Sequence, residues 1–484
     1  MVLNLINSVK WVLISQISKI LCQVAVLILL ARLMLPSEYG LIALASIIVA
    51  LGMLFRDMGT SAAIIQKNLL NNKVINAVFL LNMLLGILVC AFLMASAQFF
   101  SAYFSQEKLS NVIILLSLTF PILSLATTQK ALMERESDFK KLAFIECSSI
   151  ILSTMLCILT AVIGGGVYSI VVQAISNALI STILIVNSSG WSIRNVRFKD
   201  IKNIKELVSF SGNLFAFNLV NYSYRNADKY IIGKNMTTTV LGAYDLSYKI
   251  MLFPIQTLTS VLSRAFFPAF SKLQNNDKAF KELFTRNTIS VSLLSFPMLT
   301  GLMALREDFV SFTFGKEWLL VSSLLLWLCP VGMIQALGSS TGSVLMAKGR
   351  TDVLFRLGCF GAFLTILGFF VSIKLSNDII FFSQFYLMSN SINFIIATYV
   401  VCRVIGYSFF DYFFVNLPIL IASVVMFFIL SIMNNFLPYG LIGFIFKILL
   451  GMFCFLIILF IYSNKYINDI FEWALVRVFK GVKN

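Results

Sequence analysis

The chain has 484 residues, a net charge of +16 and no histidine, and 59% of its residues are hydrophobic while only 12% are charged. Soluble proteins carry about 25% charged residues, so this composition excludes a soluble fold and predicts a polytopic membrane protein. The lack of histidine and of any Cys-x-x-Cys pair removes most thiolate and imidazole metal sites. We expect no nucleic-acid partner, because the cytoplasmic loops of membrane proteins are themselves rich in lysine and arginine.

Fourteen segments are apolar enough to span a bilayer, for which a helix needs about 20 residues. They lie near 11–34, 39–55, 74–99, 112–130, 143–163, 167–187, 211–232, 240–262, 288–305, 318–346, 356–373, 380–402, 412–433 and 440–462. The connections between them are short and leave no room for a large soluble domain. We therefore predict an all-α polytopic membrane protein of about 14 transmembrane helices.

The positions of the basic residues predict the orientation. If the N-terminus is cytoplasmic, 26 of the 37 Lys and Arg residues fall on the cytoplasmic side, six on the outer side and five within spans. Because positive charge gathers in cytoplasmic loops, we predict that both termini face the cytoplasm.

Two segments of the chain repeat one pattern. Residues Ala31–Ala45 read ARLMLPSEYGLIALA, and Gly233–Ser247 read GKNMTTTVLGAYDLS. In each, a helix end with a basic residue is followed by a short polar turn and then by a glycine that opens the next helix. A shift of 202 residues places Gly40 on Gly242. We interpret this as an internal repeat.

The repeat predicts two lobes. Six helices separate the copies, so both enter the membrane in the same sense, and the lobes form a parallel pseudo-repeat about an axis along the membrane normal. We predict a six-helix lobe with a cytoplasmic linker at 1–210, a second six-helix lobe at 211–403, and two extra helices with a cytoplasmic amphipathic tail at 404–484. Secondary transporters often have such repeats, with the substrate site between them.

Polar residues follow helical spacing on three of the predicted helices, where a central charge costs about 2.5–3.5 kcal/mol. They are Gln16, Lys19 and Gln23; Asn218, Asn221, Tyr222, Arg225, Asp228 and Lys229; and Asp245, Tyr248, Lys249 and Gln256. We expect them to line one cavity. Its four cations, against the two aspartates, give a net charge of +2, which favours an anion such as a phosphate.

Other interpretations stay open. Arg225 or Lys229 with Asp228, and Asp245 with Lys249, have the spacing of local helix ion pairs. Lys19 lies two turns into its helix and can extend to the cytoplasmic face. A catalytic function is disfavoured, since no nucleophile–base pair, carboxylate pair or metal cluster stands at an aqueous edge. We therefore predict a transporter rather than an enzyme.

Three segments of the chain resemble the polysaccharide transporters of the multidrug/oligosaccharidyl-lipid/polysaccharide flippase superfamily. They are the first repeat copy, RDMGTSAAIIQK (Arg56–Lys67) and IIGKNMTTTVLGAYDLSYKI (Ile231–Ile250). The similarity is closest to Wzx-type flippases of the colanic acid and O-antigen type. It covers nearly the whole chain.

This resemblance implies a flippase that moves an undecaprenyl-pyrophosphate-linked oligosaccharide to the periplasmic leaflet for lipopolysaccharide or other surface polysaccharide biosynthesis. Arg225, Lys229, Lys249 and Lys19 would bind the pyrophosphate, and the last two helices would offer a groove for the lipid tail. Membrane lipids, a polysaccharide polymerase and chain-length machinery are the implied partners. No cofactor is expected, but Asp228 and Asp245 are candidates for H⁺ or Na⁺ coupling. A lipid II flippase and a multidrug or cation exporter of the same fold are the alternatives.

Overall fold

The protein, in its computed structural model, is built from helices that fall into two compact units, residues 1–242 and 243–484. The structure describes residues 2–58, 60, 61, 64, 71–191, 215, 218–434, 436 and 440–462. The described part of the chain contains helices and no strand, which confirms the all-α prediction. The predicted amphipathic tail at 465–483 and most of the basic linker before residue 210 lie outside the described residues.

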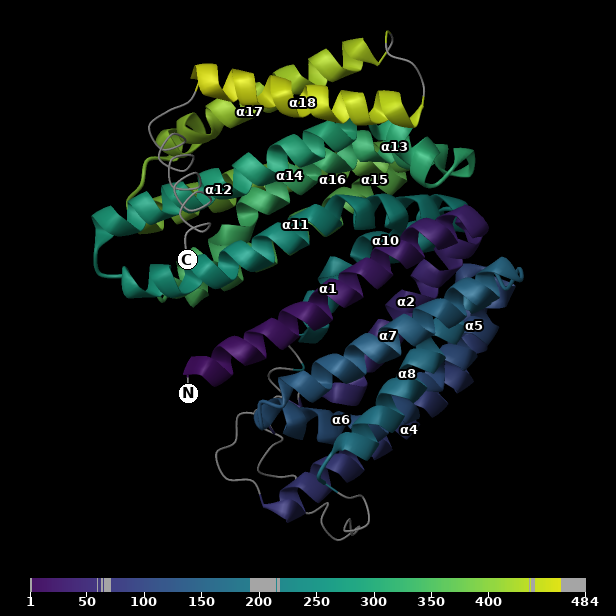
Figure 1. Ribbon diagram of the computed structural model, residues 1–484. Coiled ribbons are helices and arrows are strands. Elements are labelled where there is room, and N and C mark those ends of the chain that lie inside the picture. Colours follow the sequence, from purple (N-terminus) through teal and green to yellow (C-terminus); the bar gives the residue numbers. More distant parts are fainter. Residues whose placement is uncertain are drawn as a thin grey trace. The chain divides into compact units, whose positions relative to one another are not determined.

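The helices of the first unit are shown in Figure 1 in purple to blue-green. They are α1 (Val2–Leu33), α2 (Pro36–Asp57), α4 (Asn72–Phe104), α5 (Glu107–Ser117), α6 (Thr119–Arg135), α7 (Phe139–Val162), α8 (Tyr168–Ser188) and α10 (Ala227–Asn235). Helix α7 packs against both α1 and α8, and α4 packs against α5 and α6. Helix α11 (Thr238–Lys272) begins in this unit and continues into the second.

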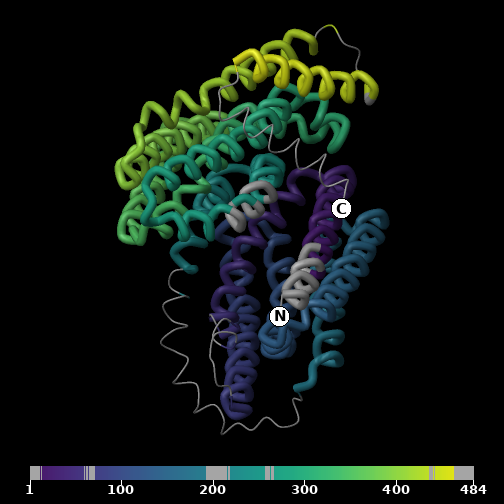
Figure 2. Tube along the Cα trace, turned by 60° about the vertical axis from the view of Figure 1, so that its left-hand side comes forward, coloured from purple at the N-terminus to yellow at the C-terminus, as the bar shows by residue number. Residues whose placement is uncertain are grey.

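The second unit contains the rest of α11 and eight further elements. These are α12 (Asp277–Ala304), α13 (Arg306–Thr313), a 3₁₀ turn (Lys316–Trp318), α14 (Leu319–Ala347), α15 (Thr351–Leu375), α16 (Ile379–Ile405), α17 (Phe409–Met433) and α18 (Leu441–Tyr462). Helix α12 packs against α14 and α17, and α16 packs against α14 and α15. The last two helices, α17 and α18, lie side by side in both views (Figures 1 and 2).

Twelve helical segments among the described residues are long and apolar enough to cross a membrane. Each matches one of the predicted spans. Of the remaining two predictions, 211–232 falls on a stretch that the structure describes only in part, and 240–262 lies within helix α11 but is not among these twelve segments. The chain is therefore a multi-pass membrane protein, and its predicted total of 14 spans stays a prediction.

Local sequence explains where several helices begin and end. Pro36 occupies the first turn of α2, where its missing N–H costs no hydrogen bond. The side chains of Asn71 and Asn276 accept backbone N–H groups at the starts of α4 and α12. Helix α16 ends at Gly406, whose φ of 65° is the left-handed conformation that glycine adopts at little cost.

One predicted span, 112–130, is divided into α5 and α6 at Leu118. Pro121 lies in the first turn of α6 and has no N–H to donate to the preceding turn. The hydroxyl groups of Ser117 and Thr119 donate to the carbonyls of Ile114 and Leu116, which satisfies acceptors around the break.

The glycines of the predicted repeat contact each other. A Cβ on Gly40 would overlap the carbonyl oxygen of Thr238, and a Cβ on Gly242 would overlap that of Pro36. Pro36 and Thr238 are themselves separated by the repeat shift of 202 residues. The starts of α2 and α11 therefore cross through equivalent residues, and only glycine permits so close an approach of the two backbones.

Candidate functional site

The polar stretch before α10 is not one continuous helix, in contrast to the predicted span 211–232. Helical backbone reaches Arg225, is interrupted at Asn226 (φ −117°, ψ 10°), and resumes as α10 at Ala227. The Asn226 amide donates to the carbonyl of Tyr222 at 2.9 Å, a side-chain bond that competes with regular helical bonding. The predicted stripe is therefore shared between two segments: Arg225 precedes the break, while Asp228 and Lys229 follow it.

Residues of this stretch differ in exposure. Arg225 and Asn221 are exposed, and Asn218 and Lys229 are partly buried. The Tyr222 hydroxyl donates to the carbonyl of Ile47 in α2 at 2.7 Å, so this tyrosine holds its segment against α2.

The two predicted coupling carboxylates are both buried. Asp228 is 3% exposed and accepts the backbone N–H of Lys229 at 2.8 Å. Asp245 is 1% exposed and forms an ion pair of 2.7 Å with Lys249, one turn further along α11. The Lys249 side chain is 45% exposed, so a ligand can reach it.

Other polar residues of α11 lie at its surface. Gln256 is exposed and Tyr248 is partly buried, with its ring stacked on that of Tyr244.

At the far end of α10, Lys234 donates to the carbonyl of Tyr103 at 2.6 Å, while the hydroxyls of Tyr230 and Tyr103 lie 2.7 Å apart. These contacts fix α10 to α4.

Lys19 has an acidic partner, Glu146, that was not predicted from the sequence. Its Nζ lies 2.8 Å from Oε2 of Glu146, and the Ser15 hydroxyl donates to the same oxygen at 2.5 Å. The other oxygen, Oε1, accepts Lys130 at 3.0 Å. One carboxylate on α7 thus joins α1 and α6. The signal in the sequence was that Glu146 is the one charged residue within the predicted span 143–163.

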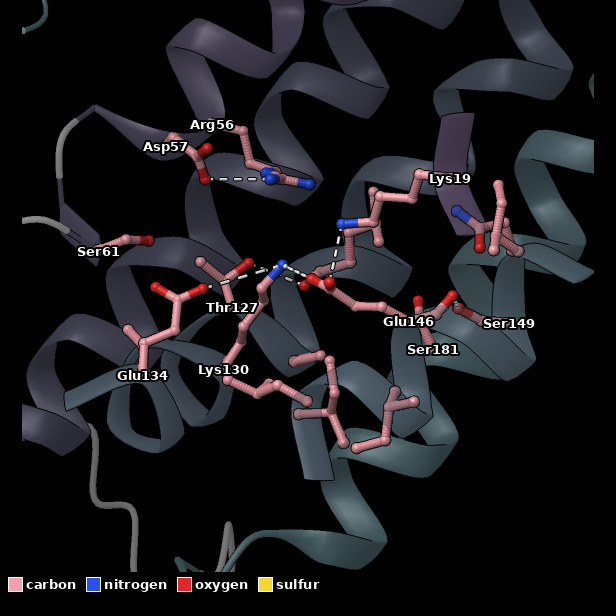
Figure 3. Close-up of a pocket in the computed structure, with 18 of the residues that line it drawn as sticks. Lys19, Arg56, Asp57, Ser61, Thr127, Lys130, Glu134, Glu146, Ser149 and Ser181 are labelled. Atoms are coloured by element: carbon pink, nitrogen blue, oxygen red, sulfur yellow. Dashed lines mark hydrogen bonds and ion pairs between the residues drawn. The ribbon is translucent and has the colours of Figure 1, made fainter. Parts of the chain in front are cut away.

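Lys19, Lys130 and Glu146 line a cavity of about 430 Å³ inside the first unit (Figure 3). The cavity is formed by α1, the C-terminal end of α2, residues along α6, the N-terminal half of α7 and the C-terminal half of α8. Its charged residues are Lys19, Arg56, Lys130, Asp57, Glu134 and Glu146, and its neutral polar residues are Gln23, Ser61, Thr127, Ser149, Asn177 and Ser181. Gln16, by contrast, is exposed and does not line it. The predicted orientation places these helix ends on the cytoplasmic side.

Arg56 is the most buried cation of this cavity. Its side chain is 10% exposed, and Nη2 lies 3.0 Å from Oδ1 of Asp57. Its Nε and Nη1 are buried and have no hydrogen-bond partner within the described part of the chain. Arg56 was not among the residues predicted to line a cavity.

A second cavity, of about 390 Å³, lies in the second unit between α12, α14, α16 and α17. Its walls are almost wholly apolar, and Asn416 and Tyr412 are their polar residues. The other lining residues are Phe296, Pro330, Met333, Ile334, Leu337, Phe394, Phe413, Phe414, Leu417 and Leu420.

Comparison with known families decides the classification. The model of the polysaccharide biosynthesis protein family matches residues 29–323, more than half of the chain. The chain belongs to this family. The lipopolysaccharide biosynthesis protein WzxC of Escherichia coli (strain K12) is similar to this chain, at 26% identity over 86% of each chain. The teichuronic acid biosynthesis protein TuaB of Bacillus subtilis (strain 168) is 26% identical over 85% of each chain. These matches confirm the predicted kinship with Wzx-type polysaccharide flippases.

Solved structures show the same fold. The lipid II flippase MurJ in an inward closed conformation superposes with a TM-score of 0.73, at 16% identity, over 97% of this chain and 100% of its own. An inward-facing multidrug resistance transporter of the MATE family gives a TM-score of 0.60 at 13% identity, covering 80% of this chain and 94% of its own. At such identities the likeness concerns the fold alone.

Proposed function

We propose that this protein is a flippase that moves an undecaprenyl-pyrophosphate-linked oligosaccharide repeat unit from the cytoplasmic to the periplasmic leaflet of a bacterial inner membrane. The observation that carries the proposal is membership of the polysaccharide biosynthesis family, joined to a MurJ-like fold. The relatives named for lipopolysaccharide and teichuronic acid biosynthesis serve the assembly of surface glycans. The activity is transport by alternating access between the two six-helix lobes, not catalysis.

In this mechanism the pyrophosphate binds to the predicted cationic residues Arg225, Lys229 and Lys249. Arg225 and Lys249 are both accessible side chains on predicted membrane helices, which is the property that an anion ligand requires. Arginine forms bidentate bonds to phosphate oxygens and keeps its charge at any physiological pH. The neutral stripe residues hold sugar hydroxyls by hydrogen bonds.

The lipid tail occupies the apolar cavity between α12, α14, α16 and α17. A polyprenyl chain has no hydrogen-bonding groups. Apart from Asn416 and Tyr412, the residues that line this cavity are apolar and need no hydrogen-bond partner. The side-chain carbonyl oxygen of Asn416 already accepts a hydrogen bond from the Ser292 hydroxyl at 2.8 Å.

Asp228 and Asp245 are the proposed coupling groups. A carboxylate this deeply buried is costly when its charge is not compensated, which makes each of the two a candidate for binding a cation. Exchange of H⁺ or Na⁺ at either residue would link ion movement to release of the anion. The proposed partners are the substrate, membrane lipids, and the polymerase and chain-length proteins that consume the product.

The test is a gene deletion complemented by variants. Deletion should abolish surface polysaccharide and lead to accumulation of one lipid-linked oligosaccharide in the cytoplasmic leaflet. Arg225→Ala and Lys249→Ala should fail to restore export at normal protein levels, whereas the control Arg403→Ala, an exposed cation at the end of α16, should restore it. Normal export by both the Arg225→Ala and the Lys249→Ala variant would refute the assigned site.

A further inference from the structure

A group of hydrogen-bonded polar side chains in the second unit is not used by the proposed pyrophosphate site. Gln335 of α14 donates from Nε2 to the Tyr386 hydroxyl of α16 at 2.9 Å, and the same nitrogen lies 3.5 Å from Oδ1 of Asn390. The Asn390 amide donates in turn to the main-chain carbonyl of Tyr386 at 2.9 Å. We call Gln335, Tyr386 and Asn390 the amide–tyrosine cluster. It joins two helices that pack side by side (Figure 1).

The amide–tyrosine cluster has an open side. Gln335 and Asn390 are both partly exposed, and the side-chain oxygen of Gln335 accepts no hydrogen bond within the described part of the chain. Gly338 and Gly342 lie one and two turns beyond Gln335 on the same face of α14. No described atom lies within 4 Å of a Cβ placed on either glycine. The described residues therefore leave the space in front of this face unfilled.

Polar side chains between membrane helices often serve only to hold the helices together, and small residues often serve only close packing. Helix α14 shows what such packing looks like at Gly332, where a Cβ would lie 2.8 Å from Met251 and 3.0 Å from Ile255. Gly338 and Gly342 have no such neighbours among the described residues. Packing within the unit explains the first glycine and leaves the other two unexplained.

The chemistry of this face suits a neutral sugar. Helix α14 contains no Asp, Glu, Lys or Arg, and α16 contains only Arg403, in its last turn. Amide and hydroxyl groups both donate and accept hydrogen bonds, as sugar hydroxyls do, whereas a sugar carboxylate would lose its hydration with no cation of these two helices beside it. The Tyr386 ring lies 6.5 Å from that of Tyr248 and 5.2 Å from that of Phe369. These rings provide an apolar surface for the C–H groups of a sugar ring.

The cluster lies beside a residue of the proposed pyrophosphate site. Tyr248, whose ring contacts that of Tyr386, directly precedes Lys249 in α11. In a lipid-linked oligosaccharide the first sugar is bonded directly to the pyrophosphate. A binding site for that sugar must therefore lie next to the residues that bind the pyrophosphate, and the amide–tyrosine cluster meets this condition.

We propose that the amide–tyrosine cluster, with the open face at Gly338 and Gly342, binds the sugar that is bonded directly to the pyrophosphate, and that it selects a neutral sugar over one that carries a carboxylate. Gln335 and Tyr386 bind hydroxyl groups of this sugar, and the two glycines leave room for its ring. The assignment rests on the proposed function, because it takes Lys249 as a pyrophosphate ligand.

The experiment is a competition between two lipids for the purified full-length protein, measured by native mass spectrometry. One lipid is polyprenyl pyrophosphate, and the other is the same lipid with a single neutral sugar, which is glucose, galactose or N-acetylglucosamine in turn. The wild type should prefer at least one of the sugar-bearing lipids by a factor on the order of ten, as one or two net hydrogen bonds would give. The lipid that carries glucuronic acid should show no such preference.

Two substitutions test the cluster and its open face. Gln335→Leu and Gly338→Leu should each bring the preference for the sugar-bearing lipid close to one, without weakening the binding of bare polyprenyl pyrophosphate. Gln384→Leu is the matched control for the first, because Gln384 lies about 200° around α16 from Tyr386. Gly358→Leu is the control for the second, at a glycine of α15 that also has no atom within 4 Å. Both controls should keep the wild-type preference, and Tyr386→Phe replaces Gln335→Leu should that variant fail to fold.

The outcomes separate this proposal from the flippase proposal. Equal binding of bare and sugar-bearing lipids by the wild type, or an unchanged preference in Gln335→Leu and Gly338→Leu, would overturn the sugar site and leave the flippase proposal standing. A purely structural cluster would give this second result, because its loss would weaken the binding of both lipids alike. A preference for glucuronic acid would overturn the selectivity. Binding of neither lipid would refute the flippase proposal and the sugar site with it.

Discussion

A fully buried ion pair joins α18, the last described helix, to α13 within the second unit. Nζ of Lys447 in α18 lies 2.6 Å from Oδ2 of Asp308 in α13, and the two side chains are 1% and 5% exposed. Removing one partner of a buried pair leaves the other charge without compensation, which costs about 3–5 kcal/mol. We expect a loss of this size in the free energy of unfolding for Lys447→Met, which retains most of the side-chain volume.

The double variant Lys447→Met/Asp308→Leu sharpens the test. With both charges removed, the desolvation cost disappears, and we expect stability within about 1 kcal/mol of the wild type or above it. The assay is unfolding of the purified protein in mixed micelles by added SDS, with Lys374→Met, an exposed lysine of α15, as the control. A loss of unfolding free energy below about 1 kcal/mol in Lys447→Met would refute the reasoning. So would a double variant that is less stable than Lys447→Met.

Two further predictions concern the first unit. Gly242→Ala should destabilise the protein by about 1–3 kcal/mol or more, because the added methyl group would overlap the Pro36 carbonyl, which cannot move aside. Gly358→Ala, where no atom lies within 4 Å, should leave the melting temperature unchanged or raised, and equal losses in both would contradict the close crossing. Tyr222→Phe should cost about 0.5–1.5 kcal/mol by losing the bond to Ile47 and should increase hydrogen exchange in its segment. Unaltered exchange there would show that this bond does not hold the segment.

Much of the helical layout could be predicted because hydropathy is a local property. Twelve predicted spans correspond to described helices, since a run of apolar side chains forms a helix in lipid wherever its neighbours lie. The interruptions at Leu118 and Asn226 were not predicted. They depend on a proline and on short polar side chains, whose effect on a helix varies with the partners that packing provides.

The candidate site was predicted less completely. Helical spacing identified the Asp245–Lys249 pair as one open interpretation, and the structure shows that pair at 2.7 Å. The count of cations missed that Lys19 is matched by Glu146, because these residues are 127 positions apart. Local spacing carries no information about such a pair.

The sequence by itself determined that the chain is an all-α membrane protein, that two segments repeat with a shift of 202 residues, and that Gly40 and Gly242 are equivalent. These properties follow from composition, hydropathy and the order of residues along the chain. Only the tertiary structure decided which charges meet. The packing of α1 and α6 around α7 brings two lysines into contact with Glu146. Arg56 of α2 is buried beside a cavity, and two of its nitrogens have no protein partner among the described residues. Electrostatic energy depends on distance in space and on burial, and both are set by how the helices pack.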